Sequence, residues 1–464
     1  MTDAVPEARL RELGEALLTR DRDAHARAVA ELAETGDERA IPYLFEVAVI
    51  DAIANDWPGF GFPELLRNRD PPRYLELPEV AWPGVIDALG ELAPPDFEAD
   101  HAWIQWETWY SQQNLELPPG FGDWKLRLFK AYLPPVGDLL DVQPRSFDLQ
   151  PVRWGNTDRS FLAALNAPDF VSAAEAEAYL EDGHHVFGFE VQGKAYAVPR
   201  WILFPHELTN FTVGDVPLSL TYCTLCNAPI LYDRRLGDRT LTFGSTGLLW
   251  QGNKLMFDQE TESLWSQHRG DALAGPICEL SGSLDIRPVT QTEWTAWRGD
   301  YPETRVLDLE TGFDLDYAHY EGNIGFFEHY WTREDVVQPG VRSEDSELPE
   351  KTEVYGVTGR DPGSIRVYPV EAVREHGPFA DEIDGRQVVV VADNTDDVAV
   401  YEAPPLPVDR DGDSLVDGNG TAWQLRRDAL AANGTRHERV PGRHGLWFAF
   451  RTQYPNPTVV TGEQ

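Results

Sequence analysis

The pattern of apolar and polar residues changes character near residue 150. Residues 7–50 carry apolar side chains at three- and four-residue spacing, which is typical of amphipathic helices. The segment from Gly36 to Pro42 interrupts that spacing, and proline is tolerated in the first turn of a following helix. Together with the apolar positions of residues 85–92, this helix–turn–helix pattern is similar to short HEAT-type α-solenoid repeats.

A further helix is predicted shortly after residue 100, and four aromatic residues lie near one of its faces. An aromatic stripe at that spacing usually belongs to a core, and stacking on a ligand is the alternative. Pro134-Pro135 and Pro144 predict a linker after this helix. The four aromatic residues are Trp103, Trp106, Trp109 and Tyr110.

From about residue 150 onward, short β-rich runs alternate with Gly, Asn, Asp and Pro, and several strings recur in the same order. This recurrence predicts an internal duplication. The expected fold class is therefore α+β, with a helical HEAT-like domain over residues 1–145, a first β-rich unit over 150–310 and a second, degenerate copy over 311–464. The recurring strings are Val186-Phe187-Gly188 with Val354-Tyr355-Gly356, Asp258 and Trp265 with Asp417 and Trp423, and Tyr301-Pro302 with Tyr454-Pro455.

Features that occur in one copy only are where we expect a site, because residues kept in both copies are explained by folding. Cys223-Thr224-Leu225-Cys226 occurs in the first copy, and its counterpart is Ala392-Asp393-Asn394-Thr395. The Gly-rich segment 241–249 also lacks a counterpart in this comparison. The first unit is therefore the expected location of a functional site.

The cysteine pair follows a run, 217–222, that predicts a β-strand, and a tight turn would bring both sulfurs to one centre. Thiolates favour zinc or Cu(I), while the same spacing suits a dithiol–disulfide pair. Two buried small residues are the third interpretation. A metal site would need further ligands, since Cys278 is single; His206 is the first candidate and His268 the second. Three protein ligands with an open position would make a catalytic type of site.

The segment from residue 243 to 267 predicts a hairpin that could close over a ligand pocket beside the cysteines. A plain β-hairpin explains its Gly-Asn sequence equally well. Because Asp258 recurs in the second copy, it also fits the role of a turn acid in the scaffold. The residues predicted to line the pocket are Tyr222, Phe243, Gly244, Gly247, Asn253, Asp258, Ser263 and Gln267.

The charge of the chain indicates the solvent conditions to which the protein is suited. It carries 78 acidic and 39 basic residues, a formal net charge of -39, and lysine occurs only five times. Solubility alone asks for a net charge of about 2–8 on a small domain. Molar salt shortens the Debye length to about 3 Å and so relieves the self-repulsion of such a chain. With 42% hydrophobic residues the chain is not an acidic disordered protein, and we expect a folded, halophilic protein with an acidic surface.

Several classes of partner and location are excluded or disfavoured by the same composition. No basic face points to nucleic acid, and no run approaches the roughly 20 apolar residues of a membrane span. The first residues show no signal segment and three cysteines make no disulfide framework, so we expect a cytoplasmic protein. No P-loop or dinucleotide fingerprint predicts a nucleotide cofactor.

At its most specific strings the sequence resembles an uncharacterised family, domain of unknown function 3179, over about residues 150–460. The strings are Thr221 to Cys226, Leu241 to Gly247, Asp258 together with Ser263 to Gln267, and His206 to Asn210. The resemblance supports His206, Cys223 and Cys226 as one constellation, does not extend to His268, and leaves export of the protein open. It implies no activity.

The function predicted from the sequence is a Cys/Cys/His metal site that binds copper or zinc. If the protein is an enzyme, oxidoreductase chemistry fits thiolate–imidazole ligation better than hydrolysis does. The alternatives are a non-catalytic module that binds a small-molecule ligand or a protein partner, and a dithiol redox protein.

Overall fold

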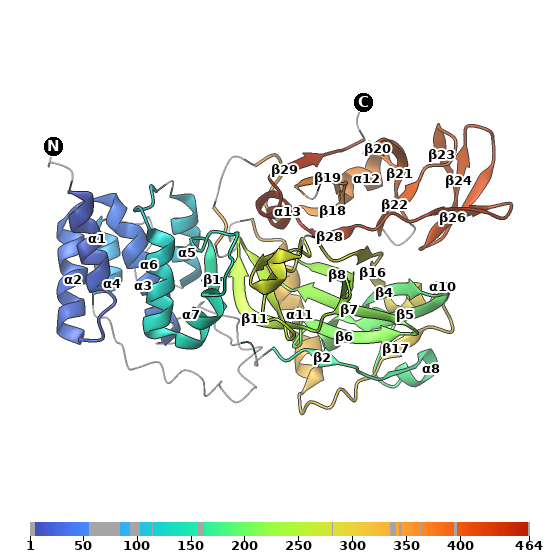
Figure 1. Cartoon of the computed structure of the whole chain (residues 1–464). Helices are drawn as coiled ribbons and strands as arrows, with labels where there is room; N and C mark the ends of the chain where they lie inside the picture. Colours follow the sequence, from blue (N-terminus) through green and yellow to red (C-terminus); the bar gives the residue numbers. More distant parts are fainter. Residues whose placement is uncertain are drawn as a thin grey trace.

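A computed structural model gives the structure of the chain. It describes residues 5–54, 84–92, 103–113, 115–155, 159, 162–280, 282–334, 340–342, 346–361, 363–393 and 397–462. Within these residues the chain is α+β: helices occupy the part before residue 141, and strands dominate the rest (Figure 1).

The N-terminal part consists of short helices around one apolar core. Leu10, Leu13 and Leu32 are almost fully buried there, which agrees with the helical spacing of apolar residues. Asp21 caps the second helix by accepting a hydrogen bond from the Ala24 amide at 2.7 Å. The helices are α1 (Glu7–Ala16), α2 (Arg22–Glu34), α3 (Ile41–Ala54), α4 (Val85–Leu92), α5 (Trp103–Gln112), α6 (Phe121–Tyr132) and α7 (Pro134–Leu140).

Most local predictions for this part are confirmed, and one is wrong. The chain turns at Gly36, and α3 begins at Ile41 with Pro42 in its first turn. Trp106 of α5 is fully buried in the core, as an aromatic stripe usually is. The linker predicted at Pro134-Pro135 is wrong, because these prolines open α7, where a missing amide hydrogen costs nothing. The HEAT-like character of these helices stays a prediction.

The first β-rich unit contains three five-stranded sheets. One has the order β1 (Val152–Trp154), β11 (Phe243–Trp250), β12 (Asn253–Asp258), β13 (Leu264–Ser266), β14 (Ala272–Ala274). Another has the order β15 (Ile286–Arg287), β8 (Ala228–Asp233), β7 (Val216–Cys223), β6 (Leu208–Val213), β2 (Leu165–Asn166). The third has the order β16 (Thr290–Glu293), β4 (His185–Val191), β5 (Lys194–Pro199), β17 (Arg305–Leu307), β3 (Phe170–Ser172).

Strand β7 lies in the middle of its sheet, and every one of its residues is buried. A strand covered on both faces carries no alternation of apolar and polar residues, which is why its sequence is apolar or uncharged throughout. This strand delivers Cys223 to the interior at its C-terminal end.

The C-terminal unit also contains three sheets. Their strands are β28 (Arg443–Leu446), β18 (Glu353–Thr358), β19 (Ser364–Pro369) and β29 (Asn456–Val459); β20 (Phe379–Ile383), β21 (Arg386–Ala392) and β22 (Val398–Glu402); and β23 (Val408–Asp411), β24 (Ser414–Asp417), β25 (Ala422–Leu425), β26 (Ala429–Ala432) and β27 (Thr435–Glu438).

Strand pairing follows the same pattern in both β-rich units. In the first, β4 is antiparallel to β5 and β16, and β17 is parallel to β5. In the second, β18 is antiparallel to β19 and β28, and β29 is parallel to β19. The indole of Trp265 donates to Asp258 at 2.9 Å, and that of Trp423 donates to Asp417 at 2.9 Å.

One expectation about the second unit is wrong. The sequence comparison predicted that the second unit has no counterpart of the hairpin that ends at Asp258 in the first unit. The structure has a shorter hairpin at that place, β23–β24, which ends at Asp417. Because β23 has four residues where β11 has eight, the correspondence was lost in a comparison of sequences.

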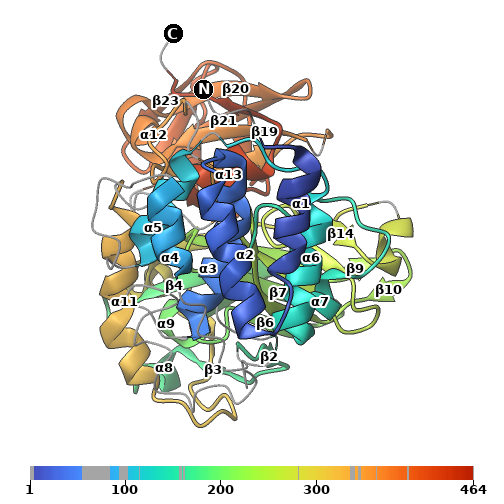
Figure 2. The same ribbon diagram turned by 90° about the vertical axis from the view of Figure 1, so that its left-hand side faces the viewer.

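Helix α11 (Tyr317–Trp331) follows the predicted boundary at residue 310 but packs against the first β-rich unit. Its residues Tyr317, Tyr320 and Phe327 belong to the apolar cluster that contains Tyr222 and both cysteines of the turn. Figures 1 and 2 show α11 alongside the first unit, with the C-terminal unit above it.

Candidate functional site

The turn that carries the two cysteines joins the antiparallel strands β7 and β8, with Cys223 paired to Ala228. Asn227 closes the turn at a φ of 47°, a left-handed conformation that asparagine tolerates better than most residues. Both cysteines are buried and free, and their Sγ atoms lie 2.6 Å apart. The turn therefore brings the sulfurs together, as their spacing predicted.

The start of β12 supplies a hydrogen-bond donor to each sulfur. The side-chain amide of Asn253 donates to Cys226 Sγ at 3.3 Å. The backbone N–H of Lys254 donates to Cys223. Because two consecutive residues of one strand donate to the two sulfurs, the hairpin β11–β12 fixes the position of the cysteine pair.

A buried ion pair lies beside the sulfurs. The Lys254 ammonium is hydrogen-bonded to the Glu207 carboxylate and donates to the Tyr222 carbonyl at 3.1 Å. The other Glu207 oxygen accepts from Thr224 Oγ1, within the turn, at 3.3 Å. Burying two charges carries a large desolvation cost, so such a pair requires close and complete hydrogen bonding.

The two thiols differ in acidity. Burial acts to raise the pKa of Cys223, but the hydrogen bond with Cys226 and the Lys254 ammonium outweigh it, and the pKa is lowered. Burial and the neighbouring Cys223 raise the pKa of Cys226 well above the ordinary value. Cys223 is therefore the thiol that ionises first and Cys226 the one that stays protonated.

Asn253 and Gln267, two predicted pocket residues, lie in this network. The Asn253 amide also donates to Gln267 Oε1 at 3.0 Å, and Gln267 donates to Thr221 Oγ1 at 2.9 Å. Both side chains are fully or almost fully buried. Together they connect the Cys226 sulfur to the Thr221 hydroxyl of strand β7.

The other predicted pocket residues are engaged elsewhere in the unit. Phe243 packs edge-on against Trp265, and a Cβ atom on Gly244 would lie 2.6 Å from the Phe257 ring. Asp258 accepts from Trp265, and Ser263 Oγ accepts from the Ile277 amide at 3.1 Å. Each of these contacts holds the scaffold of the sheet.

Two further predicted pocket residues are also structural. Tyr222 packs against Phe187 and bonds Asn227 Oδ1 at 3.1 Å, on the opposite face of β7 from its neighbour Cys223. Gly247 has a φ of 76°, which a residue without Cβ adopts readily.

His206 is buried, and both of its ring nitrogens have hydrogen-bond partners. Nδ1 lies 2.7 Å from the Ala163 carbonyl, and Nε2 lies 2.6 Å from the Tyr317 hydroxyl. In the part of the chain that the structure describes, no three His, Cys, Asp or Glu side chains are grouped so as to hold a metal ion. The predicted Cys223, Cys226 and His206 set is thus not assembled in this structure.

His268, the second histidine considered as a ligand, lies in an aromatic environment between Phe450 and Tyr454. Burial and the nearby Arg443 and Arg269 lower its pKa well below the ordinary value. Its imidazole is therefore neutral. Its backbone amide donates to Asn253 Oδ1 at 3.1 Å, which links it to the cysteine site through the main chain.

Sequence reasoning missed the role of Lys254 and of Glu207. The available signal was the rarity of lysine, because Lys254 is one of five in an acidic chain and lies within an apolar strand. Helix α11 was missed as well: the Trp331 indole donates to the Thr224 carbonyl at 2.9 Å. On the other side, the Leu446 amide of the C-terminal unit donates to the Cys226 carbonyl at 2.9 Å.

The fold and site together define an α+β protein with a buried cysteine pair at the meeting point of two β-rich units. Residues 162–457 match the family described as "Protein of unknown function (DUF3179)", and the chain belongs to this family. Comparison with curated proteins and with solved structures gave no match. Among the described residues, no helix is long and apolar enough to cross a membrane.

Proposed function

We propose that the first β-rich unit carries a redox-active dithiol formed by Cys223 and Cys226. The observation that carries this proposal is the 2.6 Å contact between the sulfurs, beside a buried ammonium that favours the Cys223 thiolate. Two structural cysteines need no buried charge next to them. The cost of burying the Lys254–Glu207 pair is explained if the pair stabilises a thiolate.

In the proposed reaction, the Cys223 thiolate attacks one sulfur of an acceptor disulfide and displaces its other sulfur as a thiolate. Cys226 then loses its proton and attacks Cys223, which releases the second half of the acceptor. The protein loses two electrons and two protons, and the acceptor becomes two thiols. Leu225, the partly exposed residue of the turn, marks the side from which a small acceptor has the shortest path to the sulfurs.

The sulfur geometry favours the dithiol over a copper or zinc centre. Two sulfurs that bind one zinc tetrahedrally at about 2.3 Å are about 3.7 Å apart. The observed 2.6 Å is closer to the roughly 2.05 Å of a disulfide. A metal site at Cys223 and Cys226 would require the turn to open and a further ligand to approach.

Counting thiols under controlled redox conditions tests the proposal. Protein equilibrated with mixtures of reduced and oxidised glutathione should lose two of its three free thiols together, in one two-electron transition. Cys223→Ser and Cys226→Ser should each abolish the transition. Cys278→Ser, which changes the partly exposed single cysteine, is the matched control and should leave it unchanged.

A metal titration of the reduced protein separates the competing function. Stoichiometric, tight binding of zinc or Cu(I) that is lost in Cys223→Ser, together with no thiol transition, would replace the dithiol by a metal centre. If the folded protein shows neither the thiol transition nor metal binding, the two cysteines are packing residues.

We also propose that the two β-rich units arose by duplication and that only the first kept a thiol site. Four strands of each unit pair in the same parallel and antiparallel pattern, which supports this origin: β4, β5, β16 and β17 in the first unit, and β18, β19, β28 and β29 in the second. The matching Asp–Trp hydrogen bonds support it further. The acid excess is proposed to be an adaptation to concentrated salt.

A further inference from the structure

The cysteine pair is enclosed, since the exposed fractions of Cys223 and Cys226 are 1% and 0%. Strand β12 donates to both sulfurs, β28 of the C-terminal unit donates to the Cys226 carbonyl, and α11 donates to the Thr224 carbonyl. An acceptor disulfide therefore has to displace a covering side chain before it reaches a sulfur. The element that yields determines which acceptors are admitted.

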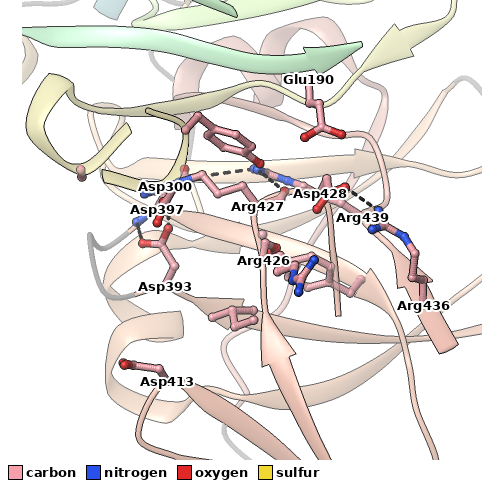
Figure 3. Close-up of a pocket in the computed structure, with 15 residues that line it drawn as sticks. Glu190, Asp300, Asp393, Asp397, Asp413, Arg426, Arg427, Asp428, Arg436 and Arg439 are labelled. Atoms are coloured by element: carbon pink, nitrogen blue, oxygen red, sulfur yellow. Dashed lines mark hydrogen bonds and ion pairs between the residues drawn. The ribbon is translucent and has the colours of Figure 1, made fainter. Parts of the chain in front are cut away.

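The C-terminal unit is fastened to the first unit by buried guanidinium groups. Figure 3 shows a cavity between the two units, in whose wall Arg427 donates to Asp300 of the first unit at 2.7 Å and to Asp393 of the second at 2.6 Å. Arg439 donates to Thr290 Oγ1 of the first unit at 2.7 Å. Because displacing this unit breaks several buried contacts, it forms a fixed wall of the site.

The side of the turn that meets α11 is the more open one. Leu225 and Tyr330 are partly exposed, and both pack against the apolar cluster that contains the two cysteines. Trp331, the neighbour of Tyr330, bonds the Thr224 carbonyl, so the last turn of α11 lies at the cysteine turn. Burial and the charge of the two sulfurs raise the pKa of Tyr330 well above its ordinary value, which places its hydroxyl within electrostatic reach of both sulfurs.

The ring of Tyr330 is held in place from outside its helix. The Lys351 ammonium lies 3.3 Å from the centroid of this ring and donates to the Tyr330 carbonyl at 3.2 Å. A cation over an aromatic face is stabilised, and Lys351 is only 5% exposed. A side chain turns about its own χ bonds without breaking backbone hydrogen bonds, so the ring can move aside while α11 stays in place.

We propose that Tyr330 determines which acceptors reach Cys223, and that it favours small disulfides over disulfides with bulky substituents. This proposal rests on the dithiol function proposed above. The Tyr330 ring covers the path from the exposed side of Leu225 to the sulfurs, and Lys351 is a positioning residue that holds the ring over this path. A slender acceptor passes when the ring turns aside, whereas a peptide-sized acceptor requires a wider opening.

Oxidation rates of the reduced full chain with two disulfides test the proposal. The disulfides are 2-hydroxyethyl disulfide, which is small, and oxidised glutathione, which is bulky; each rate is divided by that of free cysteine with the same disulfide. Molar KCl screens the charge of glutathione. The wild-type protein should prefer the small disulfide. Tyr330→Ala should speed oxidation by glutathione about tenfold or more and remove this preference, which corresponds to a barrier lower by about 1.4 kcal/mol.

Two further variants separate the ring from its hydroxyl and from its support. Tyr330→Phe keeps the ring and should retain the preference of the wild-type protein. Lys351→Met removes the cation over the ring and should speed oxidation by glutathione, by a smaller factor than Tyr330→Ala. Loss of the preference in Tyr330→Phe would overturn the proposal, because the hydroxyl and not the bulk of the ring would then control the rate.

The matched control is Tyr320→Ala, the same substitution at a buried tyrosine of α11. Tyr320 lies ten residues before Tyr330, about 15 Å along the helix, so its removal should leave the preference unchanged. An equal effect of Tyr320→Ala and Tyr330→Ala would show general loosening of α11 and would overturn the proposal. Unchanged rates in Tyr330→Ala, with the wild-type protein oxidised, would overturn it alone. Failure of both disulfides to oxidise any variant would overturn it together with the dithiol function.

Discussion

Lys254 is the residue on which the chemistry of the cysteine pair depends. Its backbone amide bonds one sulfur, and its ammonium is held beside that sulfur by Glu207 and the Tyr222 carbonyl. A buried ammonium with these partners stabilises negative charge on Cys223. The acidity of the thiol is therefore set by a residue on a different strand.

Removing this ammonium should raise the pKa of Cys223. The variant Lys254→Met combined with Glu207→Gln removes both charges, which avoids the roughly 3–5 kcal/mol cost of leaving one buried charge unpaired. Ultraviolet thiolate absorbance of the reduced protein, followed against pH, measures the change. Lys194→Met, at an exposed lysine, is the control; an equal titration in both variants would show that Lys254 does not act on the thiol.

The same pKa shift predicts how stability depends on pH. The pKa of Cys223 is lowered in the folded protein from an ordinary value of 9.0, so its thiolate stabilises the fold above pH 9.0. This contribution is lost as the pH falls through the folded pKa. The stability of the reduced wild-type protein relative to Cys223→Ala should therefore increase with pH up to about 9, measured by urea denaturation. A difference that does not change with pH contradicts the lowered pKa.

At this scale the sequence predicted the cysteine turn but not its surroundings. Cys223 and Cys226 are three positions apart, so a local strand-and-turn pattern was enough to bring them together. Lys254 and Glu207 are 47 positions apart and meet only through the packing of β12 against the β6–β7 region. His206 was expected as a ligand because it precedes the cysteine strand, yet its ring bonds Ala163 and Tyr317.

Among the elements, the β11–β14 sheet is the part that positions the donors to the sulfurs. Trp265 of β13, the strand paired with β12, is fully buried, and its indole donates to the buried Asp258. The hairpin was predicted from its Gly-Asn turn, and Gln251 and Gly252 adopt φ values of 50° and 75° there. The ligand pocket predicted under it stays a prediction, because Asn253 alone of the predicted residues bonds a sulfur through its side chain, and Gln267 is linked to that sulfur only through Asn253.

Trp265→Ala should destabilise the protein by about 3–5 kcal/mol, because it leaves a large cavity and removes the indole hydrogen bond to the buried Asp258. Trp265→Phe keeps most of the ring and removes the N–H donor, so its smaller cost isolates the hydrogen bond. Chemical denaturation measures both. Trp423→Ala makes the corresponding change in the second unit, and a negligible loss at Trp265 would show that this sheet does not hold the site.

For the whole molecule, the pattern of apolar residues predicted the division into a helical part and a β-rich part. It did not predict α11, which lies beyond the expected boundary at residue 310 and packs Tyr317, Tyr320 and Phe327 against the first unit. The sequence also did not predict the contacts at the seam between the two β-rich units. Its ion pairs, such as Arg427 with Asp300, join residues more than a hundred positions apart.

The net charge of -39 predicts that salt stabilises the folded protein. Screening of the self-repulsion is nearly complete once the Debye length falls to about 3 Å, near molar salt. The melting temperature should therefore rise from dilute buffer to molar KCl. Salt adaptation also predicts that it rises further above molar KCl, beyond the concentration at which screening saturates. A melting temperature that is constant over this range contradicts salt adaptation.

The central claim, a redox-active pair at Cys223 and Cys226, is tested most directly by the mass of one peptide. No Lys or Arg lies between Arg200 and Arg234, so trypsin releases both cysteines on the single peptide Trp201–Arg234. After equilibration of the native protein with oxidised glutathione and alkylation of free thiols, this peptide should be unalkylated and lighter than its reduced form by two hydrogen atoms. Reduction before alkylation should restore two alkylated cysteines. A peptide that carries two alkylated cysteines under both conditions would contradict the claim.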